Sequence, residues 1–421
     1  MRHCMTGFGF GPIQSGLFVA EAFASGRFDR IVISEIDVDL VAAVRANKGR
    51  YAVNIALSDR IEVRNIEGIE LLNPNDPDDQ NRLSDALCQS TEMVTSLPSV
   101  SFYTAGDDRS VAALIADGMR DRPLPAIVYT AENNNHAAEI LCEKVGSFLG
   151  RPVPSNIQFL NTVIGKMSQV VTDPAVIRRM NLEPIVPGLN KAFLVESFNR
   201  ILVTRTTIPG FQPGIEVFIE KDDLLPFEEA KLYGHNAIHA LLAFLAAFRG
   251  LSRMTDVAGD QRIMEIARKV FLDESGTALT RKYARLGDPL FTKSGYRAYA
   301  EDLLTRMTNP WLNDTVERAA RDPIRKLAPN DRIFGTMSLA LEYGIEPKNM
   351  AFGALAGLIS ILRQPQACPL PDSLRFSAAD PIPRSDLRSL IRWVWGDQTP
   401  RFADRMIDHV FQVQRGLLDF L

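Results

Sequence analysis

The stretch GFGFGPIQSG, which runs from Gly7 to Gly16, decides the fold of the first part of the chain. It places four glycines within ten residues. Such a composition is costly in any ordered segment, because glycine loses the most conformational freedom on folding. Two structures explain it: a turn that lets backbone amides approach a phosphate group, or a flexible N-terminus. The residues on either side of the stretch favour the turn.

These flanking residues follow the order of a dinucleotide-binding unit: a strand, a tight glycine turn, and a helix whose N-terminal amides face the pyrophosphate. Residues 2–7 (RHCMTG) predict the strand, and Ser15–Ser25 (SGLFVAEAFAS) predicts the helix. Gly9 and Gly11 fit the first two glycines of the GxGxxG pattern. The stretch is therefore a candidate phosphate-binding turn.

The third glycine position of the pattern is occupied by Gln14, and Gly16 follows two residues later. A long side chain must therefore fit where the strand and the helix usually pack closely. Further along, Glu35 ends the next predicted strand, where an acid accepts hydrogen bonds from the adenine ribose and favours NAD over NADP. The alternative is that Glu35 only caps a helix or is solvated. The candidate cofactor-binding residues are Gly9, Gly11, Gln14, Gly16 and Glu35.

Short strand-like runs alternate with helical stretches through the first half of the chain. The runs at 31–37, 124–130 and 156–165 predict strands, and those at 39–49 and 136–150 predict helices. Such alternation is typical of a parallel sheet covered by helices. It predicts a Rossmann-like α/β domain.

The character of the sequence changes after a run rich in proline and glycine. Residues 182–190 (LEPIVPGLN) predict a boundary, and helical periodicity dominates from Phe227 onward. We therefore expect a dinucleotide-binding domain over residues 1–190. A mostly α-helical domain that binds substrate and carries the catalytic residues is expected over 191–421.

The overall composition excludes several classes of protein. The chain has 421 residues, 46% of them hydrophobic, with a net charge of −4 and a pI near 5.9. Nucleic-acid and anionic-membrane binders usually carry a basic excess, and no run of 18 apolar residues predicts a membrane span. The four cysteines are scattered, which argues against a disulfide framework and favours the cytoplasm. They are Cys4, Cys88, Cys142 and Cys368.

The segment Glu228–Phe248 carries the residues that suggest a chemistry. On an α-helix, with Lys231 at 0°, His235 lies at roughly 40°, His239 at roughly 80° and Asn236 at roughly 140°. A cation, an amide and two imidazoles thus share one partly apolar face. The alternative is an ordinary amphipathic helix with a solvated side. Zinc binding by the two histidines is a further alternative, but no third ligand stands nearby and we expect no metal.

The spacing Lys231-x4-Asn236-x2-His239 resembles the motif of the polyol-specific long-chain dehydrogenases, the mannitol dehydrogenase family. Three further stretches are similar to the family in the same order. They are GFGFGPIQSGLF (7–18), AENNNH (131–136), with Asn133 in the amide position, and LVESFNR (194–200).

The resemblance implies an NAD-dependent, metal-independent polyol dehydrogenase, with mannitol 1-phosphate and fructose 6-phosphate as the first candidates for polyol and ketose. Lys231 would be the general base and Asn236 would hold the reacting oxygen. His239 would bind a neighbouring hydroxyl or orient the lysine, and Asn133 would add a second amide. A hexuronate reductase, a free-mannitol 2-dehydrogenase and a non-catalytic NAD sensor remain alternatives.

The sequence departs from the family where a substrate phosphate would bind. Asn161 stands where phosphate-using members have an aspartate, and Lys166 stands in an arginine position. Lysine cannot grip a phosphate in the bidentate way that arginine does, so the exact substrate stays open. Lys166, Asn161 and Glu196 are the candidate substrate-binding residues. We expect a small-molecule substrate and no nucleic-acid or membrane partner; the sequence does not determine the oligomeric state.

Overall fold

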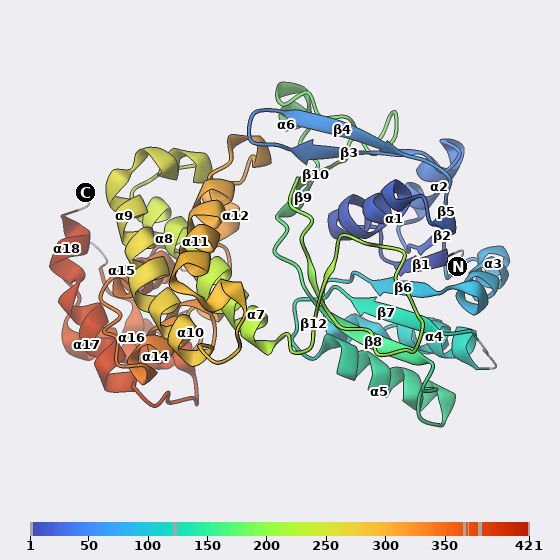
Figure 1. Cartoon of the computed structure of the whole chain (residues 1–421). Helices are drawn as coiled ribbons and strands as arrows, with labels where there is room; N and C mark the ends of the chain where they lie inside the picture. The colour runs from blue at the N-terminus through green and yellow to red at the C-terminus, as the bar shows by residue number, and fades with distance from the viewer. Residues whose placement is uncertain (1–2, 121–123, 365–367, 369, 378–380, 420–421) are drawn as a thin grey trace. The chain divides into compact units, whose positions relative to one another are not determined.

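The computed structural model describes residues 3–120, 124–364, 368, 370–377 and 381–419, and it divides into two compact units (Figure 1). The first unit spans Met1–Leu225 and the second Pro226–Leu421. The division falls later than the boundary expected after residue 190. The reason is that the three strands that follow residue 190 all pair within the first unit.

The first unit is built on an eight-stranded sheet in the order β12-β11-β8-β7-β6-β1-β2-β5. Six of these strands, from β8 to β5 in that order, are parallel. Their order is that of a doubly wound dinucleotide fold, in which strand order reverses between the first and fourth strands, here β1 and β6. The bounds are β1 His3–Phe8, β2 Phe28–Ser34, β5 Ile69–Leu72, β6 Glu92–Thr95, β7 Ala126–Thr130, β8 Ile157–Val163, β11 Leu202–Thr204 and β12 Ile219–Lys221.

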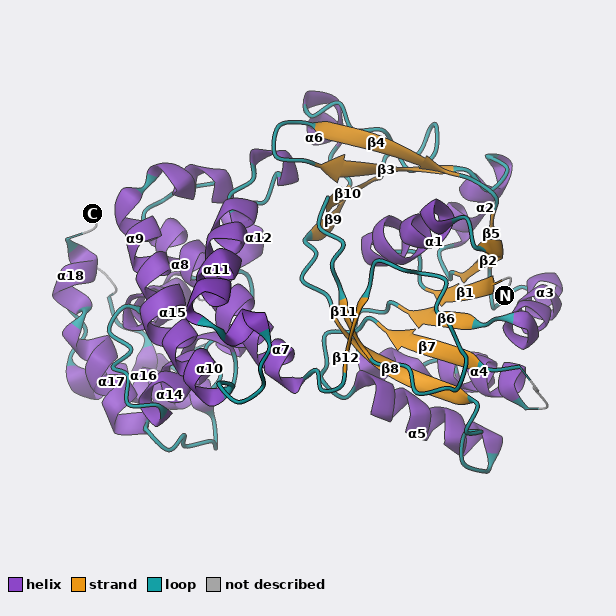
Figure 2. Ribbon diagram, in the orientation of Figure 1, coloured by secondary structure: helices purple, strands orange, loops and turns teal. Residues whose placement is uncertain are grey.

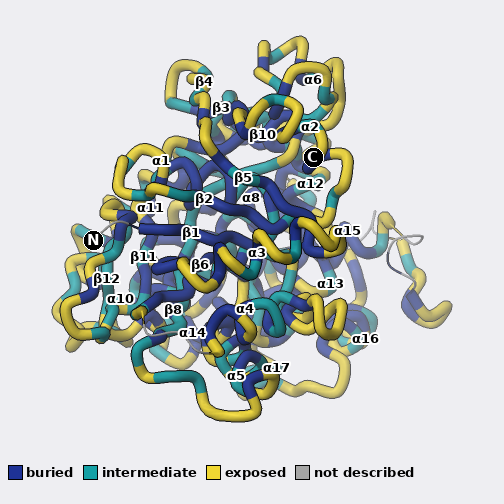
Figure 3. The backbone as a smooth tube through the Cα atoms, turned by 90° about the vertical axis from the view of Figure 1, so that its right-hand side faces the viewer, coloured by how far each residue is buried: buried dark blue, intermediate teal, exposed yellow. Residues whose placement is uncertain are grey.

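Helices cover both faces of this sheet (Figure 2). Apolar side chains alternate along β1, so that Met5 packs in the core on one face and Phe8 in the core on the other. The central strands β1 and β6 are consequently buried throughout (Figure 3). The helices that pack in the core with Met5 are η1 Gln14–Val19, α1 Ala20–Ser25 and α2 Val38–Ala46. Those that pack in the core with Phe8 are α3 Pro77–Gln89, α4 Val111–Met119 and α5 Ala137–Leu149.

A second, four-stranded sheet packs on the helix that follows the glycine turn. Its order is β4-β3-β10-β9, with bounds β3 Tyr51–Ala56, β4 Ile61–Ile66, β9 Ser168–Val171 and β10 Ala192–Glu196. A Cβ on Gly16 would lie 2.7 Å from Val195 Cγ1 and 3.2 Å from Val53 Cγ1. Gly16 therefore permits close packing of the helix on this sheet, which the sequence analysis did not predict.

Gln14 fits at the third glycine position because the residue that faces it on β1 is Gly7, which has no side chain. A Cβ on Gly7 would lie 1.9 Å from Gln14 Nε2, so Gly7 provides the space that the amide fills. Gln14 is fully buried, and neither polar atom of its side chain has a hydrogen-bond partner in the described structure. The glutamine thus contributes packing at this position.

The second unit is mostly helical, as predicted, and is organised around one buried helix. The chain runs through α7 (Leu225–Ala230) and η4 (Lys231–Asn236) into α8 (Ala237–Phe248), of which ten residues are buried. A Cβ on Gly353 would lie 2.4 Å from Leu241, so α8 and α15 (Met350–Arg363) pack closely. The other helices used below are α9 Gln261–Lys269, η6 Val270–Ser275, α11 Lys293–Met307, α12 Val316–Ala320, α14 Arg332–Glu342 and α17 Ala403–Gln412.

Among the residues that the structure describes, no helix combines the length and the apolar character needed to cross a bilayer.

We predict that Gly16→Ala destabilises the first unit by about 1–3 kcal/mol, because the added methyl group overpacks the contact with Val195. The measurement is the unfolding midpoint in urea. Gly11→Ala is the matched control, since a Cβ there meets nothing within 4 Å, and its midpoint should stay at the wild-type value. Equal midpoints for the two variants would contradict the packing role of Gly16.

Candidate active site

The glycine turn opens into a cavity of about 510 Å³ at the carboxyl ends of β1, β2 and β6. This is the position where ligands bind in open α/β sheets, next to the point at which strand order reverses. Gly9 has a φ of +83°, and a Cβ on it would lie 2.8 Å from the main-chain oxygen of Ser96. Gly11 lines the cavity without a side chain to fill it. The turn therefore has the open backbone surface that a pyrophosphate requires.

Glu35 lines the same cavity and is held by main-chain amides. Its Oε2 accepts a hydrogen bond from Phe10 N at 2.7 Å, and its Oε1 accepts bonds from Ile36 N at 2.7 Å and Asp37 N at 2.9 Å. The carboxylate thus ties the glycine turn to the end of β2. This placement is compatible with hydrogen bonds to ribose hydroxyls, since carboxylate oxygens have further acceptor capacity.

The opposite wall of the cavity is mainly apolar and was not identified from the sequence. It combines loop residues with residues of two 3-10 helices and of α4, which no local pattern connects. The residues are Pro74, Leu97, Pro98, Phe102, Leu114 and the cation Arg109. An apolar slot of this kind suits a planar heterocycle.

A buried carboxylate joins two of the strand ends near this cavity. Glu132 accepts hydrogen bonds from Tyr103 Oη at 2.5 Å, Leu97 N at 2.8 Å and Thr95 Oγ1 at 2.9 Å. Burial raises the pKa of Glu132. The next residue is the candidate catalytic amide Asn133, which is exposed at the carboxyl end of β7. Glu132 therefore fixes the loop that presents Asn133.

The three candidate substrate-binding residues of the first unit all make internal contacts. Asn161 Oδ1 accepts from Ala138 N at 2.9 Å at the start of α5, and its amide donates to Glu139. Lys166 Nζ donates to the main-chain oxygens of Glu196 and Phe198. Glu196 accepts from Met167 N at 2.5 Å and is buried. These contacts give each residue a structural role.

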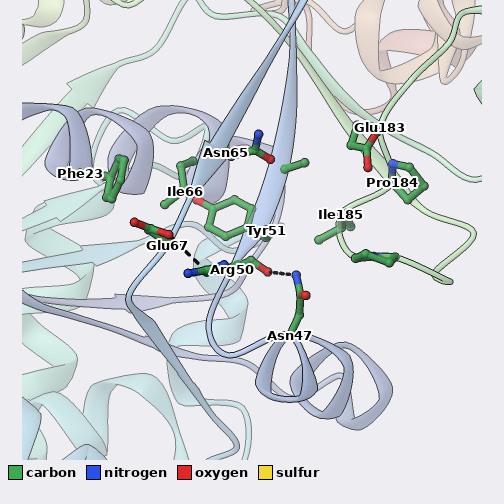
Figure 4. Close-up of a pocket in the computed structure, with 12 residues that line it drawn as sticks. Phe23, Asn47, Arg50, Tyr51, Asn65, Ile66, Glu67, Glu183, Pro184 and Ile185 are labelled. Atoms are coloured by element: carbon green, nitrogen blue, oxygen red, sulfur yellow. Dashed lines mark hydrogen bonds and ion pairs between the residues drawn. The ribbon is translucent and has the colours of Figure 1, made fainter.

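A second cavity of about 510 Å³ in the first unit lies where β3 begins and β4 ends, and it shares no lining residue with the cavity at the glycine turn (Figure 4). Three of its charged and polar residues interact with one another. Arg50 pairs with Glu67 at 3.2 Å, and Asn47 donates to the main-chain oxygen of Arg50 at 2.7 Å. We assign no ligand to it.

In the second unit, the segment that carries Lys231 and Asn236 is a π-helix, η4, rather than an α-helix. Hydrogen bonds in a π-helix join residues i and i+5, so these two residues, five positions apart, lie about one turn apart. The angle of roughly 140° expected from α-helical geometry therefore does not apply. Short π-helical segments of this kind occur frequently at functional sites.

Close neighbours allow only glycine in the middle of η4. A Cβ on Gly234 would lie 2.8 Å from Tyr296 Oη and 3.2 Å from Phe271. The π-helical turn is thus packed tightly against α11 and η6.

Lys231 is held in its neutral form more readily than an ordinary lysine. Burial and the positive charge of Arg332 lower the pKa of Lys231 to about 8, and Glu228 opposes the shift. Arg332 begins α14, which packs against η4, and its side chain is 15% exposed. Its Nε lies 3.5 Å from Asp331 and makes no hydrogen bond in the part of the chain that the structure describes. Arg332 was not predicted from the sequence, because about 100 residues separate it from Lys231.

The two histidines of the motif have different environments. His235 is buried, and burial together with the charge of Arg306 lowers its pKa well below the usual value. His239 is partly exposed, and its Nε2 lies 3.1 Å from Asp314 Oδ2. The predicted residues Lys231, Asn236 and His239 are thus all on one helical segment of the second unit, whereas Asn133 and the glycine turn belong to the first.

Comparisons with known proteins agree with this architecture. A model of the mannitol dehydrogenase C-terminal domain matches residues 223–367. The mannitol-1-phosphate 5-dehydrogenase of Pseudarthrobacter chlorophenolicus is 28% identical over 367 residues, 84% of this chain and 83% of that protein. The enzyme of the same name from Thermoanaerobacter pseudethanolicus is 29% identical over 374 residues, 87% of this chain and 89% of that protein.

Two solved structures share the fold over the whole chain. A D-sorbitol dehydrogenase in substrate-free form has a TM-score of 0.78 at 15% identity, with 100% of this chain and 95% of that chain covered. The mannitol 2-dehydrogenase of Pseudomonas fluorescens, in a complex with NAD and D-mannitol, has a TM-score of 0.69 at 17% identity, with 100% and 92% covered.

The fold is therefore that of the dehydrogenases that join a doubly wound nucleotide-binding unit to a helical unit. Within this class, residues 223–367 match the C-terminal domain of the mannitol dehydrogenases, the family that the Lys231–His239 motif resembles.

We predict that Arg332→Gln raises the pKa of Lys231 from about 8 toward its ordinary value of 10.5, because a nearby positive charge is removed. The same variant should raise the pKa of Lys326, which is lowered by burial and then by the charges of Arg332 and Arg325. The measurement is NMR titration of protein labelled with [13Cε]lysine.

The matched control is Arg325→Gln, which should raise the pKa of Lys326 and leave that of Lys231 unchanged. A Lys231 titration that is the same in wild type and in Arg332→Gln would contradict the assigned cause.

Proposed function

We propose that the protein is an NAD-dependent dehydrogenase that reversibly converts a polyol to a ketose without a metal, with Lys231 as general base. The observation that carries the proposal is the partly buried Lys231 with a pKa of about 8, on the π-helix that also presents Asn236. The curated relatives, named mannitol-1-phosphate 5-dehydrogenase, favour mannitol 1-phosphate as the polyol and fructose 6-phosphate as the ketose.

The cavity at the glycine turn fits a dinucleotide. Gly9 and Gly11 would leave the backbone open toward the pyrophosphate, the apolar wall would accommodate the adenine, and Glu35 would favour the free ribose hydroxyls of NAD over a 2′-phosphate. When bound, NAD⁺ supplies the acceptor for the hydride that leaves the alcohol carbon.

Lys231 removes the other hydrogen of the alcohol. Its neutral Nζ takes the hydroxyl proton as the C–H bond breaks and the C=O bond forms, and the resulting ammonium returns the proton in the reverse reaction. A pKa of about 8 suits both directions, since the neutral fraction grows as the pH rises through this value. The Asn236 amide donates a hydrogen bond to the oxygen and stabilises its developing negative charge.

The second unit also supplies a cation for the substrate. The side chain of Arg332 is 15% exposed, and its Nε, 3.5 Å from Asp331, makes no hydrogen bond to any described residue. Arginine binds phosphate and carboxylate through paired N–H groups. We therefore assign the anionic end of a sugar-alcohol phosphate to Arg332 rather than to Lys166, whose amine bonds to main-chain oxygens. A hexuronate would offer a carboxylate to the same group, and a free polyol would offer none.

The test follows NADH formation with mannitol 1-phosphate, mannitol and an aldonate as substrates. We expect the highest kcat/KM for the phosphate. A preference for mannitol or the aldonate would change the substrate, and no turnover with any of them, together with tight NAD binding, would favour a sensor instead.

We predict that Lys231→Ala lowers kcat by roughly 10²- to 10⁴-fold, the range typical of a lost general base. NAD affinity, measured by calorimetry, should stay unchanged because the cofactor cavity lies in the first unit. The control is Lys221→Ala, on an edge strand of the first unit, which should retain full activity. Equal turnover by Lys231→Ala and wild type would refute the base assignment.

A further prediction is that Gly11→Ala weakens NAD binding by about tenfold or more, because its methyl group projects into the space reserved for the pyrophosphate. Its unfolding midpoint should equal that of wild type, which separates a binding effect from misfolding. Unchanged NAD affinity would argue that the cofactor lies elsewhere.

A further inference from the structure

A buried aspartate outside the sequence motif makes a charged contact with a residue of the motif. Asp314 is 4% exposed and lies just before α12. Its Oδ2 is 3.1 Å from His239 Nε2, and its Oδ1 accepts a hydrogen bond from Arg318 Nε at 2.9 Å. Each carboxylate oxygen therefore has one dedicated partner.

The partners determine which nitrogen of His239 carries the proton. A carboxylate only accepts hydrogen bonds, so Nε2 must donate to it. In the neutral ring the other nitrogen, Nδ1, is then an acceptor. Arg318 is a donor only, and it prevents the carboxylate from turning away from the histidine.

The geometry points to Asp314 as a positioning residue: with Arg318, it holds His239 as the Nε2–H tautomer, so that Nδ1 accepts a hydrogen bond from a hydroxyl group of the polyol next to the reacting carbon. This inference rests on the proposed function, because it assigns the acceptor to a polyol substrate. Beyond the proposed function, it means that Asp314 selects substrates that carry a hydroxyl group on the carbon next to the reacting carbon.

The wild-type protein tests the tautomer without any substitution. The chain has five histidines, and 15N labelling of their rings separates protonated from unprotonated nitrogens by NMR. At a pH where the ring is neutral, we expect a protonated Nε2 and an unprotonated Nδ1 for His239. The signals of His239 are identified by their absence from the spectrum of His239→Gln. The opposite tautomer overturns the proposal.

The substitution Asp314→Asn should reverse the tautomer of His239 while it keeps the volume of the side chain nearly constant. Arg318 will draw the oxygen of the introduced amide toward itself, so the NH₂ group of that amide faces His239 and donates to Nε2. The proton then moves to Nδ1, which can no longer accept from the substrate. We expect the reversed tautomer and a roughly 10- to 100-fold lower kcat/KM for the polyol, with an unchanged KM for NAD.

The double variant Asp314→Asn/Arg318→Met provides a rescue. Without Arg318 the amide can turn its oxygen toward His239, so the Nε2–H tautomer and part of the lost kcat/KM should return. If Asp314 has a purely structural role, the double variant should lose more activity than the single variant.

The matched control is Glu346→Gln. It breaks a second carboxylate–histidine pair, in which Glu346 lies 2.6 Å from Nε2 of His409 on α17, and it should leave kcat/KM unchanged.

The outcomes separate this inference from the proposed function. If the wild type turns over no polyol, the proposed function fails. If the wild type is active and Asp314→Asn keeps its kcat/KM and its His239 tautomer, only the role of Asp314 fails. A further loss without tautomer recovery in the double variant counts against the positioning role as well.

Discussion

A partly buried lysine whose pKa is lowered by desolvation and by the charge of an arginine is the constraint on which the site in the second unit depends. One pKa unit corresponds to about 1.4 kcal/mol, so a shift from 10.5 to about 8 favours the neutral amine by about 3 kcal/mol. This preference is a cost whenever Lys231 is protonated, and the packing of the surrounding helices must offset it. The buried helix α8 and the close approach of α15 at Gly353 provide such packing. The same burial disfavours a charged His235.

The arrangement of Lys231 and Asn236 shows where sequence analysis reached its limit. The residue types and their spacing were readable, because a helical segment is local in sequence. Their relative orientation was not, because α-helical periodicity was assumed for a segment that forms a π-helix. The only local hint is Gly234 in mid-helix, and its reason, contact with Tyr296 and Phe271, depends on distant segments.

The fold shows the same contrast. The strand, glycine turn, helix and acid from His3 to Glu35 are contiguous, and the structure has them in the predicted order. The four-stranded sheet was missed because it pairs β3 with β10, strands far apart in the chain. Gln14 looked like a defect of the motif, yet Gly7 on the facing strand compensates for it. A single sequence offers no means of connecting such distant partners.

Candidate cations illustrate why contacts, rather than residue types, decide a site. Lys166 and Arg332 are both positively charged, and only Lys166 lies in a stretch of sequence that was compared with the family. Lys166 uses its hydrogen bonds on main-chain oxygens at the end of β10, where it stabilises the fold. Within the described residues, Arg332 Nε makes no hydrogen bond, although it lies 3.5 Å from Asp331, and the charge of Arg332 lowers the pKa of Lys231. On the proposed function, one arginine then serves two purposes: it keeps the base neutral and it offers charge to an anionic substrate. Binding of that anion would offset the charge of Arg332 and raise the proton affinity of Lys231, so substrate binding and proton transfer are coupled through this residue.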